Sequence, residues 1–270
     1  MAEEFDRDLA VLVTSCDAYR DVETPFLSLF RRYWPDCPYE LVLVAETGRD
    51  ANAGELSFDR VVATGKGKNW CQMLVEALER ISTPYVLMLM NDYLLDSPVD
   101  AGGFARRLAQ AKSFDAANLR LNPNPAGRLR WRDSDLLEYP KNVAYCVTCQ
   151  TGIWNREYLL DLARRNRSAW EFERFGSFML ANEKRPLLVA PTKEFPFVDA
   201  VHKGYWEKIG VEVCERNGVS IDYSARGLPP LNVQAKELVK KIIFAVFPWT
   251  LIVRVQNFFN VGMKESPKKG

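Results

Sequence analysis

Short apolar runs alternate with stretches of helical periodicity along the first ninety residues, and this alternation constrains the fold more than any other feature. The runs are continuously apolar, which is typical of strands buried on both faces of a parallel sheet. The stretches between them repeat apolar residues at helical spacing. The predicted order is a strand at residues 9–16, a helix at 24–34, strands at 40–45 and 60–64, a helix at 70–81 and a strand at 85–90. This order predicts an α/β fold with a mainly parallel sheet flanked by helices.

The second half of the chain continues the pattern less regularly. Helices are predicted at residues 101–111 and 156–165, and strands at 116–121 and 143–151. The segment 122–142 is rich in Pro, Gly, Arg and Asp, so it is expected to form a surface excursion.

A Pro-containing linker predicts a boundary between a large domain, residues 1–227, and a C-terminal amphipathic segment, residues 228–270. The apolar core of that segment, residues 242–253, is shorter than the roughly 20 residues that cross a bilayer. Basic residues flank it and a Trp lies within it. Residues 236–259 are therefore predicted either to lie on an anionic membrane face or to pack on the domain or a partner subunit.

The charge balance excludes one class of partner. Lys and Arg number 36 against 35 Asp and Glu, which gives a net charge of +1. Proteins that bind nucleic acid usually carry a clear basic excess, so no nucleic-acid partner is predicted. The acidic start, residues 1–8, has no secretory-signal pattern, and the expected location is the cytoplasm, at the inner face of a membrane if the C-terminal segment binds one.

Polar residues follow the predicted strands at the edge where α/β sheets bind ligands. Ser15 and Asp17 follow the first strand, Lys66 and Lys68 lie in a Gly-rich turn before a helix, and Asp92 follows the strand at 85–90. Helix-start amides and lysines favour phosphate, whereas carboxylates favour Mg²⁺ or Mn²⁺. Together they predict a site for a nucleoside diphosphate with a divalent cation.

Several ordered segments resemble the GT-A fold glycosyltransferases, especially small bacterial enzymes of surface-polysaccharide assembly. The segments are Val11-Leu-Val-Thr-Ser-Cys-Asp17, residues 70–93 ending in Asn91-Asp92-Tyr93, Gln150-Thr-Gly-Ile-Trp154, Trp170-Glu-Phe-Glu173 and His202. The resemblance spans about residues 9–206 and departs from the family at Asn91, where an acidic residue is usual. It implies a GT-A-like, Rossmann-like fold.

The resemblance also implies roles for individual residues. Gly152, Trp154 and Trp170 would contact a glycan or lipid-linked acceptor. Asp92 and His202 would bind the cation, and His202 could instead contact the diphosphate. Asp17 would contact the base or ribose of a nucleotide-sugar donor, and the two lysines its diphosphate. Glu173, or failing it Glu171, would be the base of an inverting transfer.

Other interpretations of these segments stay open. Ser168 and Glu171 have the spacing of a helix capping box, which accounts for Glu171 without catalysis. A nucleotidyltransferase can share this sheet, and it would release pyrophosphate. The alternative to an enzyme is a binding protein without catalytic activity, whose metal site has been lost.

Overall fold

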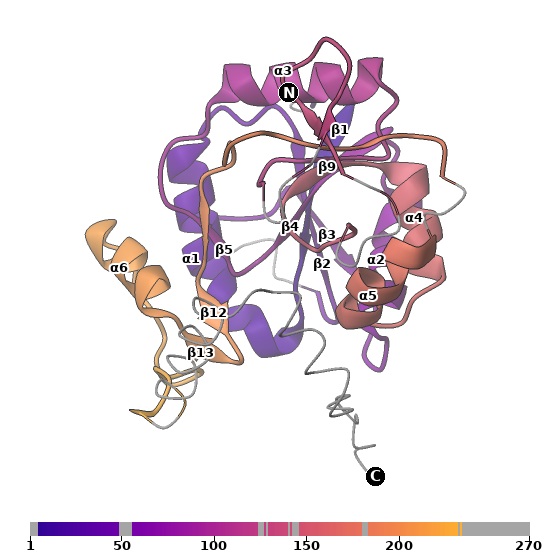
Figure 1. Cartoon of the computed structure of the whole chain (residues 1–270). Coiled ribbons are helices and arrows are strands. Elements are labelled where there is room, and N and C mark those ends of the chain that lie inside the picture. Colours follow the sequence, from indigo (N-terminus) through magenta and orange to yellow (C-terminus); the bar gives the residue numbers. More distant parts are fainter. Residues whose placement is uncertain are drawn as a thin grey trace. The chain divides into compact units, whose positions relative to one another are not determined.

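The computed structural model describes residues 5–48, 56–123, 127, 129–139, 141, 146–179, 183–231 and 233 (Figure 1). The chain divides into two compact units, residues 1–226 and 227–270. The predicted membrane-contacting segment, residues 236–259, lies outside the described residues. All elements below belong to the first unit.

The strands of the described residues form one large sheet and two small ones. The large sheet has the order β3-β2-β1-β4-β9-β6-β10-β8-β7. Its strands are β1 Leu9–Thr14, β2 Glu40–Ala45, β3 Arg60–Ala63, β4 Tyr85–Met90, β6 Asn118–Arg120, β7 Leu129–Arg130, β8 Leu137–Glu138, β9 Gly152–Asn155 and β10 Leu187–Val189. Strands β1 to β4 pair in parallel, and β6 pairs in parallel with β10. The predicted mainly parallel sheet is confirmed.

Helices cover both faces of this sheet (Figure 1). They are α1 Arg20–Tyr33, α2 Trp70–Arg80, α3 Ala101–Ser113, α4 Arg156–Arg164, α5 Ala169–Met179 and α6 Lys208–Arg216, with a 3₁₀ turn η1 at Asp17–Tyr19. Successive side chains of a strand point to opposite faces. Val11 and Val13 of β1 therefore pack in one apolar core with α1, while Ala10 and Leu12 pack in a second core with α2 and α4. The fold class predicted from the alternation is confirmed.

The central strand β9 corrects a sequence prediction. A strand was expected at residues 143–151, but residues 146–151 are bends and β9 is Gly152–Asn155. It runs antiparallel between β4 and β6. The backbones approach closely there, because a Cβ on Gly152 would lie 2.8 Å from Asn118 Nδ2 and 3.2 Å from Leu119 O. Glycine at this position therefore serves strand packing.

Two short antiparallel strand pairs lie near the end of β4. Strand β5 (Tyr93–Leu95) pairs with β11 (Phe197–Asp199), and β12 (Val201–His202) forms a hairpin with β13 (Tyr205–Trp206). The hairpin turn has φ of 52° at Lys203 and 81° at Gly204, as a two-residue type I′ turn requires. Ala200 N donates to Asp92 O at 2.9 Å, so the 197–206 segment is anchored where β4 ends.

Candidate functional site

Asn91 fixes the loop between β1 and α1 through two hydrogen bonds. Its Nδ2 donates to Ser15 Oγ at 2.9 Å and to Tyr19 O at 2.8 Å, and Ser15 Oγ donates to Glu23 Oε1 at 3.0 Å. Asn91, Ser15 and Glu23 are all buried. An aspartate could not donate these two bonds. The departure from the family motif at Asn91 thus has a structural reason, because the amide fixes the backbone of the loop.

Asp17 lies at the same edge, between the ends of β1 and β2. Its Oδ1 accepts from Thr47 Oγ1 at 2.8 Å and Thr47 N at 3.3 Å, and its backbone N donates to Glu46 Oε2 at 2.8 Å. Because β1 also pairs in parallel with β4 up to Thr14 and Met90, the residues that follow these two strands leave the sheet at one edge. The structure therefore brings Ser15, Asp17 and Asp92 to one end of the sheet.

Asp92 is the most perturbed carboxyl of this edge. Burial, and then the negative charge of Asp199, raise its pKa to about 7, whereas the positive charge of Arg226 opposes the shift. Its Oδ1 is shut off from solvent and has no hydrogen-bond partner among the described residues. A buried oxygen without a partner is costly, and strongly perturbed carboxyls of this kind are enriched at functional sites, so Asp92 stays a candidate site residue.

Sequence reasoning missed Arg226, which lies 205 positions from its partner Asp21. Its Nε and Nη2 donate to the two Asp21 carboxylate oxygens at 2.8 and 3.0 Å, and Nη2 also donates to Ala18 O at 2.7 Å. The guanidinium lies 4.2 Å from the centroid of the Tyr19 ring. Arg226 is only 7% exposed. No local sequence signal marks this contact, because the two ends meet only in the folded chain.

His202 is exposed on the β12–β13 hairpin, three residues after Asp199. Burial raises the pKa of Asp199, and the charges of Lys193 and His202 oppose that shift. Asp199 links the predicted ligands, because its charge also acts on Asp92. Asp199 thus lies within reach of the charges of both Asp92 and His202, and the predicted roles of these two residues stay predictions.

The described residues show no complete set of protein ligands for the predicted divalent cation. Within the ranges that the structure describes, no group of three or more His, Cys, Asp or Glu side chains is placed to hold a metal ion. The Nδ2 of Asn91 donates to Ser15 and Tyr19, so Oδ1 is the only atom of this amide that could ligate a cation. The binding of a cation by Asp92 and His202 stays a prediction.

The two lysines of the Gly-rich turn differ in their surroundings. The turn uses positive φ of 85° at both Gly65 and Gly67, and it leads to Asn69, which caps α2 in a capping box with Gln72. Lys68 Nζ is bound by Glu76 of α2 and by a backbone carbonyl of the turn. Lys66 is exposed at its tip. Lys66 is therefore the better placed of the two predicted phosphate contacts.

Glu173 of α5, the predicted base, is half-buried and accepts a backbone hydrogen bond. Its Oε1 accepts from Cys149 N at 2.8 Å. Burial raises the pKa of Glu173, and the Cys149 bond and the charge of Arg120 oppose the rise. Tyr93 connects Glu173 to the strand edge, because its hydroxyl donates to the carbonyl of Cys149 at 3.5 Å. Burial raises the pKa of this hydroxyl, and the charges of Asp199, Asp92 and Glu173 add to that rise.

Glu171, by contrast, belongs to the start of α5. Ser168 Oγ accepts from Glu171 N at 3.2 Å, and Glu171 Oε2 accepts from Arg167 N at 3.0 Å. The predicted cap by Ser168 is confirmed, although the glutamate reaches Arg167 N instead of Ser168 N. Trp170, beside this cap, is 60% exposed, so its ring is open to a ligand.

The predicted acceptor role of Gly152 and Trp154 needs correction. Both lie in β9, in the middle of the sheet. Trp154 is 1% exposed, and its ring packs against Tyr158 and Phe172 with centroids 6.2 and 5.9 Å away. Neither face of the ring is open to a sugar, so Trp154 is a core residue.

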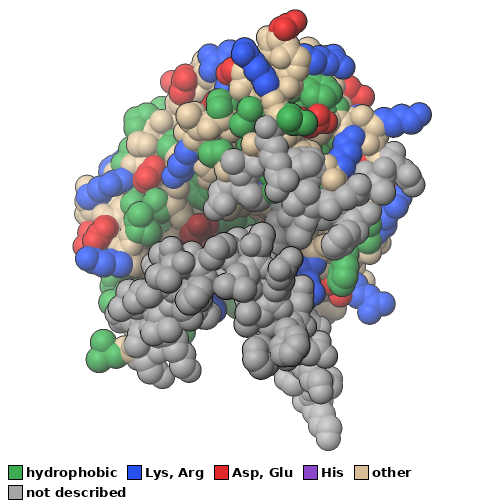
Figure 2. All heavy atoms as spheres, viewed as in Figure 1, with side chains coloured by type: hydrophobic (Ala, Val, Ile, Leu, Met, Phe, Trp, Pro, Cys, Tyr) green, Lys and Arg blue, Asp and Glu red, His purple; other side chains and the backbone are tan. Residues whose placement is uncertain are grey.

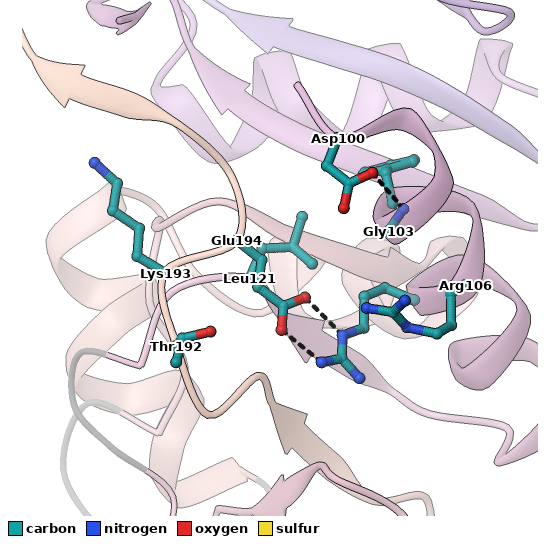
Figure 3. A pocket seen from close by; sticks show the side chains of 9 residues that line it. Asp100, Gly103, Arg106, Leu121, Thr192, Lys193 and Glu194 are labelled. Atoms are coloured by element: carbon teal, nitrogen blue, oxygen red, sulfur yellow. Dashed lines mark hydrogen bonds and ion pairs between the residues drawn. The ribbon is translucent and has the colours of Figure 1, made fainter. Parts of the chain in front are cut away.

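A cavity of about 340 Å³ lies between the first half of α3 and residues 192–194 (Figure 3). Arg107, 1% exposed, forms one wall and is bound by Glu194 and by Asp135. The described lining of this cavity includes no predicted site residue. The cavity is therefore separate from the carboxyl ends of β1 and β4.

Two features of the described residues concern possible partners: the charge of the surface and the length of the helices. Figure 2 shows Lys and Arg side chains interspersed with Asp and Glu on the visible face, in keeping with the balanced charge of the chain. No helix in the described part of the chain is long and apolar enough to cross a membrane.

Comparisons with known proteins give distant structural similarities. No protein-family model matches the chain, and no curated relative matches it in sequence. The structure is similar to S. aureus TarS 1-349 with a TM-score of 0.40 and 15% identity, over 68% of this chain and 60% of that one. It is similar to a cytidylyltransferase from Leptospira borgpetersenii with a TM-score of 0.44 and 12% identity, over 79% of this chain and 96% of that one.

A third similar structure is mannosyltransferase PcManGT from Pyrobaculum calidifontis in complex with GDP-Man and Mn²⁺, with a TM-score of 0.43 and 14% identity, over 76% of this chain and 62% of that one. The chain thus spans 60% and 62% of the lengths of the TarS fragment and PcManGT. Similarities of this size assign no activity to this chain. Its fold class rests on its own strand order and helix layers.

Proposed function

We propose that this chain is a glycosyltransferase that moves a sugar from a nucleotide-sugar donor to a glycan or lipid-linked acceptor in polysaccharide biosynthesis, with inversion. One observation carries the proposal: Tyr93, which directly follows Asp92 at the end of β4, donates through its hydroxyl to Cys149 O at 3.5 Å, and Cys149 N donates to Glu173 Oε1 on α5 at 2.8 Å. The carboxyl at the end of β4 and the candidate base, 81 positions apart in sequence, therefore belong to one region.

The donor side is the edge formed by the ends of β1 and β4. We assign the contact with the base or ribose to Asp17, which lies at this edge on a loop that Ser15 helps to fix. Asp92, whose Oδ1 is buried and has no hydrogen-bond partner among the described residues, follows β4 at the same edge. Ligands of α/β sheets bind at this edge, which supports a nucleotide here.

The acceptor side is the start of α5. Glu173, with a raised pKa, takes the proton of an acceptor hydroxyl as its oxygen bonds to the sugar carbon and the bond to the leaving phosphate breaks. A base is most effective when its pKa approaches the working pH, and partial burial moves Glu173 in that direction. Trp170 offers an exposed ring for a sugar face next to this base.

The test begins with a thermal-shift panel of nucleotide sugars on the full chain, followed by analysis of the released product for the donor that binds. Release of a nucleoside diphosphate or monophosphate is expected. Release of pyrophosphate from a nucleoside triphosphate would instead identify a nucleotidyltransferase, and binding without turnover of any donor would identify a binding protein.

Glu173→Gln and Glu171→Gln form a matched pair on one helix. We expect Glu173→Gln to lower kcat by about 10²- to 10⁴-fold with little change in donor binding. Glu171→Gln keeps an oxygen that can accept from Arg167 N, so its kcat should stay within a fewfold of the parent. Equal activity of the two variants would refute the assignment of the base.

A further inference from the structure

The cavity beside α3 lies past the ends of two strands that run in the same direction as β4. Strand β9 is antiparallel to both β4 and β6, so β6 runs with β4, and β10 is parallel to β6. Leu121, in one wall of the cavity, directly follows β6, and residues 192–194, in another wall, follow β10. Sheets of this kind bind ligands beyond the carboxyl ends of their strands, which is where this cavity lies.

Hydrogen bonds among its own residues hold the walls of the cavity in place. Arg107 Nε donates to Glu194 Oε2 at 2.6 Å, and its two terminal nitrogens donate to the carboxylate oxygens of Asp135 at 2.7 Å each. Glu194 N donates to Leu121 O at 2.9 Å, which joins the 192–194 segment to the end of β6. The volume of about 340 Å³ is at the lower end of the range of ligand pockets, about 300–1,000 Å³. The cavity is therefore preformed and suits a small ligand.

Gly103 shapes the wall that α3 contributes. It lies in the first turn of the helix, where glycine stabilises a helix less than alanine does. Asp100, the N-cap residue, accepts from Gly103 N through Oδ1 at 2.9 Å (Figure 3). A Cβ on Gly103 would clash with Asp100 Oδ2, so a larger residue would displace this carboxylate from the wall. The same bond occupies Gly103 N, which is therefore not available to an anion.

Polar groups of the cavity keep unused hydrogen-bonding capacity. Arg106 is exposed, and its guanidinium makes no hydrogen bond or ion pair with a residue that the structure describes. The same holds, among the described residues, for the hydroxyl of Thr192 and for Asp100 Oδ2. Lys193, by contrast, points away from Arg106 (Figure 3), and its Nζ donates to Phe197 O at 2.5 Å. A ligand here therefore meets donors and acceptors together.

The charges of the lining indicate the chemical class of this ligand. Basic and acidic side chains line the cavity in similar numbers: Arg106, Arg107, Lys193, Asp100 and Glu194. Since neither sign of charge prevails, an ion gains little, whereas hydroxyl groups can donate to a carboxylate and accept from a guanidinium. The buried side chains of Phe104 and Leu121 add apolar contact for the C–H groups of a ring. A neutral sugar combines these properties.

We propose that this cavity binds a short neutral saccharide, with Asp100 as hydrogen-bond acceptor and Arg106 and Thr192 as donors. The inference goes beyond the proposed function, because binding here requires neither a nucleotide-sugar donor nor transfer. It places a second saccharide site on the other face of the sheet from Trp170. Helix α3 packs in one apolar core and α5 in the other.

The test is saturation-transfer NMR of the full chain, without donor, on glucose, galactose, N-acetylglucosamine, maltose and lactose. Glucuronate and glucose 6-phosphate serve as anionic counterparts, and the sugar with the strongest signal is then titrated by calorimetry. We expect a neutral sugar to bind at least as tightly as its anionic counterpart. Arg106→Ala should weaken it about 10-fold, because a charged hydrogen bond is lost.

A second variant and two controls separate the cavity from other surfaces. Asp100→Asn keeps an oxygen that can cap α3 but removes the charge, so it should weaken binding a fewfold without lowering Tm. Arg165→Ala removes an exposed arginine at the end of α4, on the other face of the sheet, and should leave the affinity unchanged. Trp170→Ala should also leave it unchanged.

Four results would overturn the proposal. The first is the absence of binding by every sugar at millimolar concentration. The second is binding by the anionic sugars alone, which would make the cavity an anion site. The third is an affinity that Arg106→Ala and Asp100→Asn leave unchanged. The fourth is binding that only Trp170→Ala abolishes, which would place the sugar at α5. None of these results touches the proposed function, which is tested by turnover of a donor.

Discussion

Replacing Asn91 by aspartate would restore an acidic residue at the family motif, and the structure predicts that it destabilises the fold. The carboxylate cannot donate to Ser15 Oγ or to Tyr19 O, which now accept at 2.9 and 2.8 Å. Each lost bond is worth about 1 kcal/mol, and leaving the Tyr19 carbonyl facing another acceptor adds at least about 1 kcal/mol. The sum, about 3 kcal/mol, lowers Tm by about 6–12 °C for a unit of this size.

The effect of Asn91→Asp depends on pH in a stated direction. Burial raises the pKa of the new carboxyl above its unfolded value of about 3.9. A group whose pKa is raised on folding contributes most favourably below the unfolded pKa, and that contribution is lost as the pH rises through the folded value. The variant should therefore become less stable relative to the parent as the pH rises from 4 toward neutrality.

Asn91→Leu is the matched control, because it removes the same two donors at similar volume without adding a charge. Chemical denaturation of the three proteins between pH 4.5 and 8 measures both effects. Asn91→Leu should lose stability by an amount that does not change with pH. If Asn91→Asp matched the parent at pH 7.5, or followed Asn91→Leu at every pH, the assignment of the Asn91 bonds would be wrong.

Three further predictions concern packing and the acceptor. Gly152→Ala, with a Cβ 2.8 Å from Asn118 Nδ2, should lower the free energy of unfolding by about 1–3 kcal/mol in urea, and an unchanged midpoint would contradict the close strand approach. Arg107→Met should cost about 3 kcal/mol, because it leaves Glu194 without its buried partner; a loss below 0.5 kcal/mol would count against that role. Trp170→Ala should raise the acceptor KM severalfold without lowering Tm, and an unchanged KM would remove Trp170 from the site.

The N-terminal half of the fold could be predicted because its strands and helices carry strong local patterns. Strands β1, β2 and β4 have six residues each, nearly all apolar and buried, so the run itself marks the strand. Helix α2 begins one residue after Asn69, a cap visible in the sequence. These elements take their form from short-range signals that the tertiary structure reinforces.

The central strand β9 could not be placed from sequence. It has four residues and runs antiparallel between two strands that are themselves parallel, a position decided by pairing with β4 and β6. Trp154 gives the same local signal whether it stacks on a ligand or fills a core. Only the packing of α4 and α5 on that face decides the matter.

Only part of the candidate site could be predicted from the sequence. Polar residues after buried strands identify Asp17 and Asp92, because parallel strands end at one edge. Arg226 gives no such signal, since its contact with Asp21 joins residues 205 positions apart. Such contacts become visible only when the chain is folded.

The late position of β9 in the chain has a consequence for biosynthesis. Strand β4 is complete at residue 90, but the strand that pairs with its second side comes only at residues 152–155. While the ribosome makes the intervening residues, β4 presents an unpaired apolar edge to other nascent chains. Slow translation between these points should therefore increase aggregation, whereas a pause after residue 155 should not.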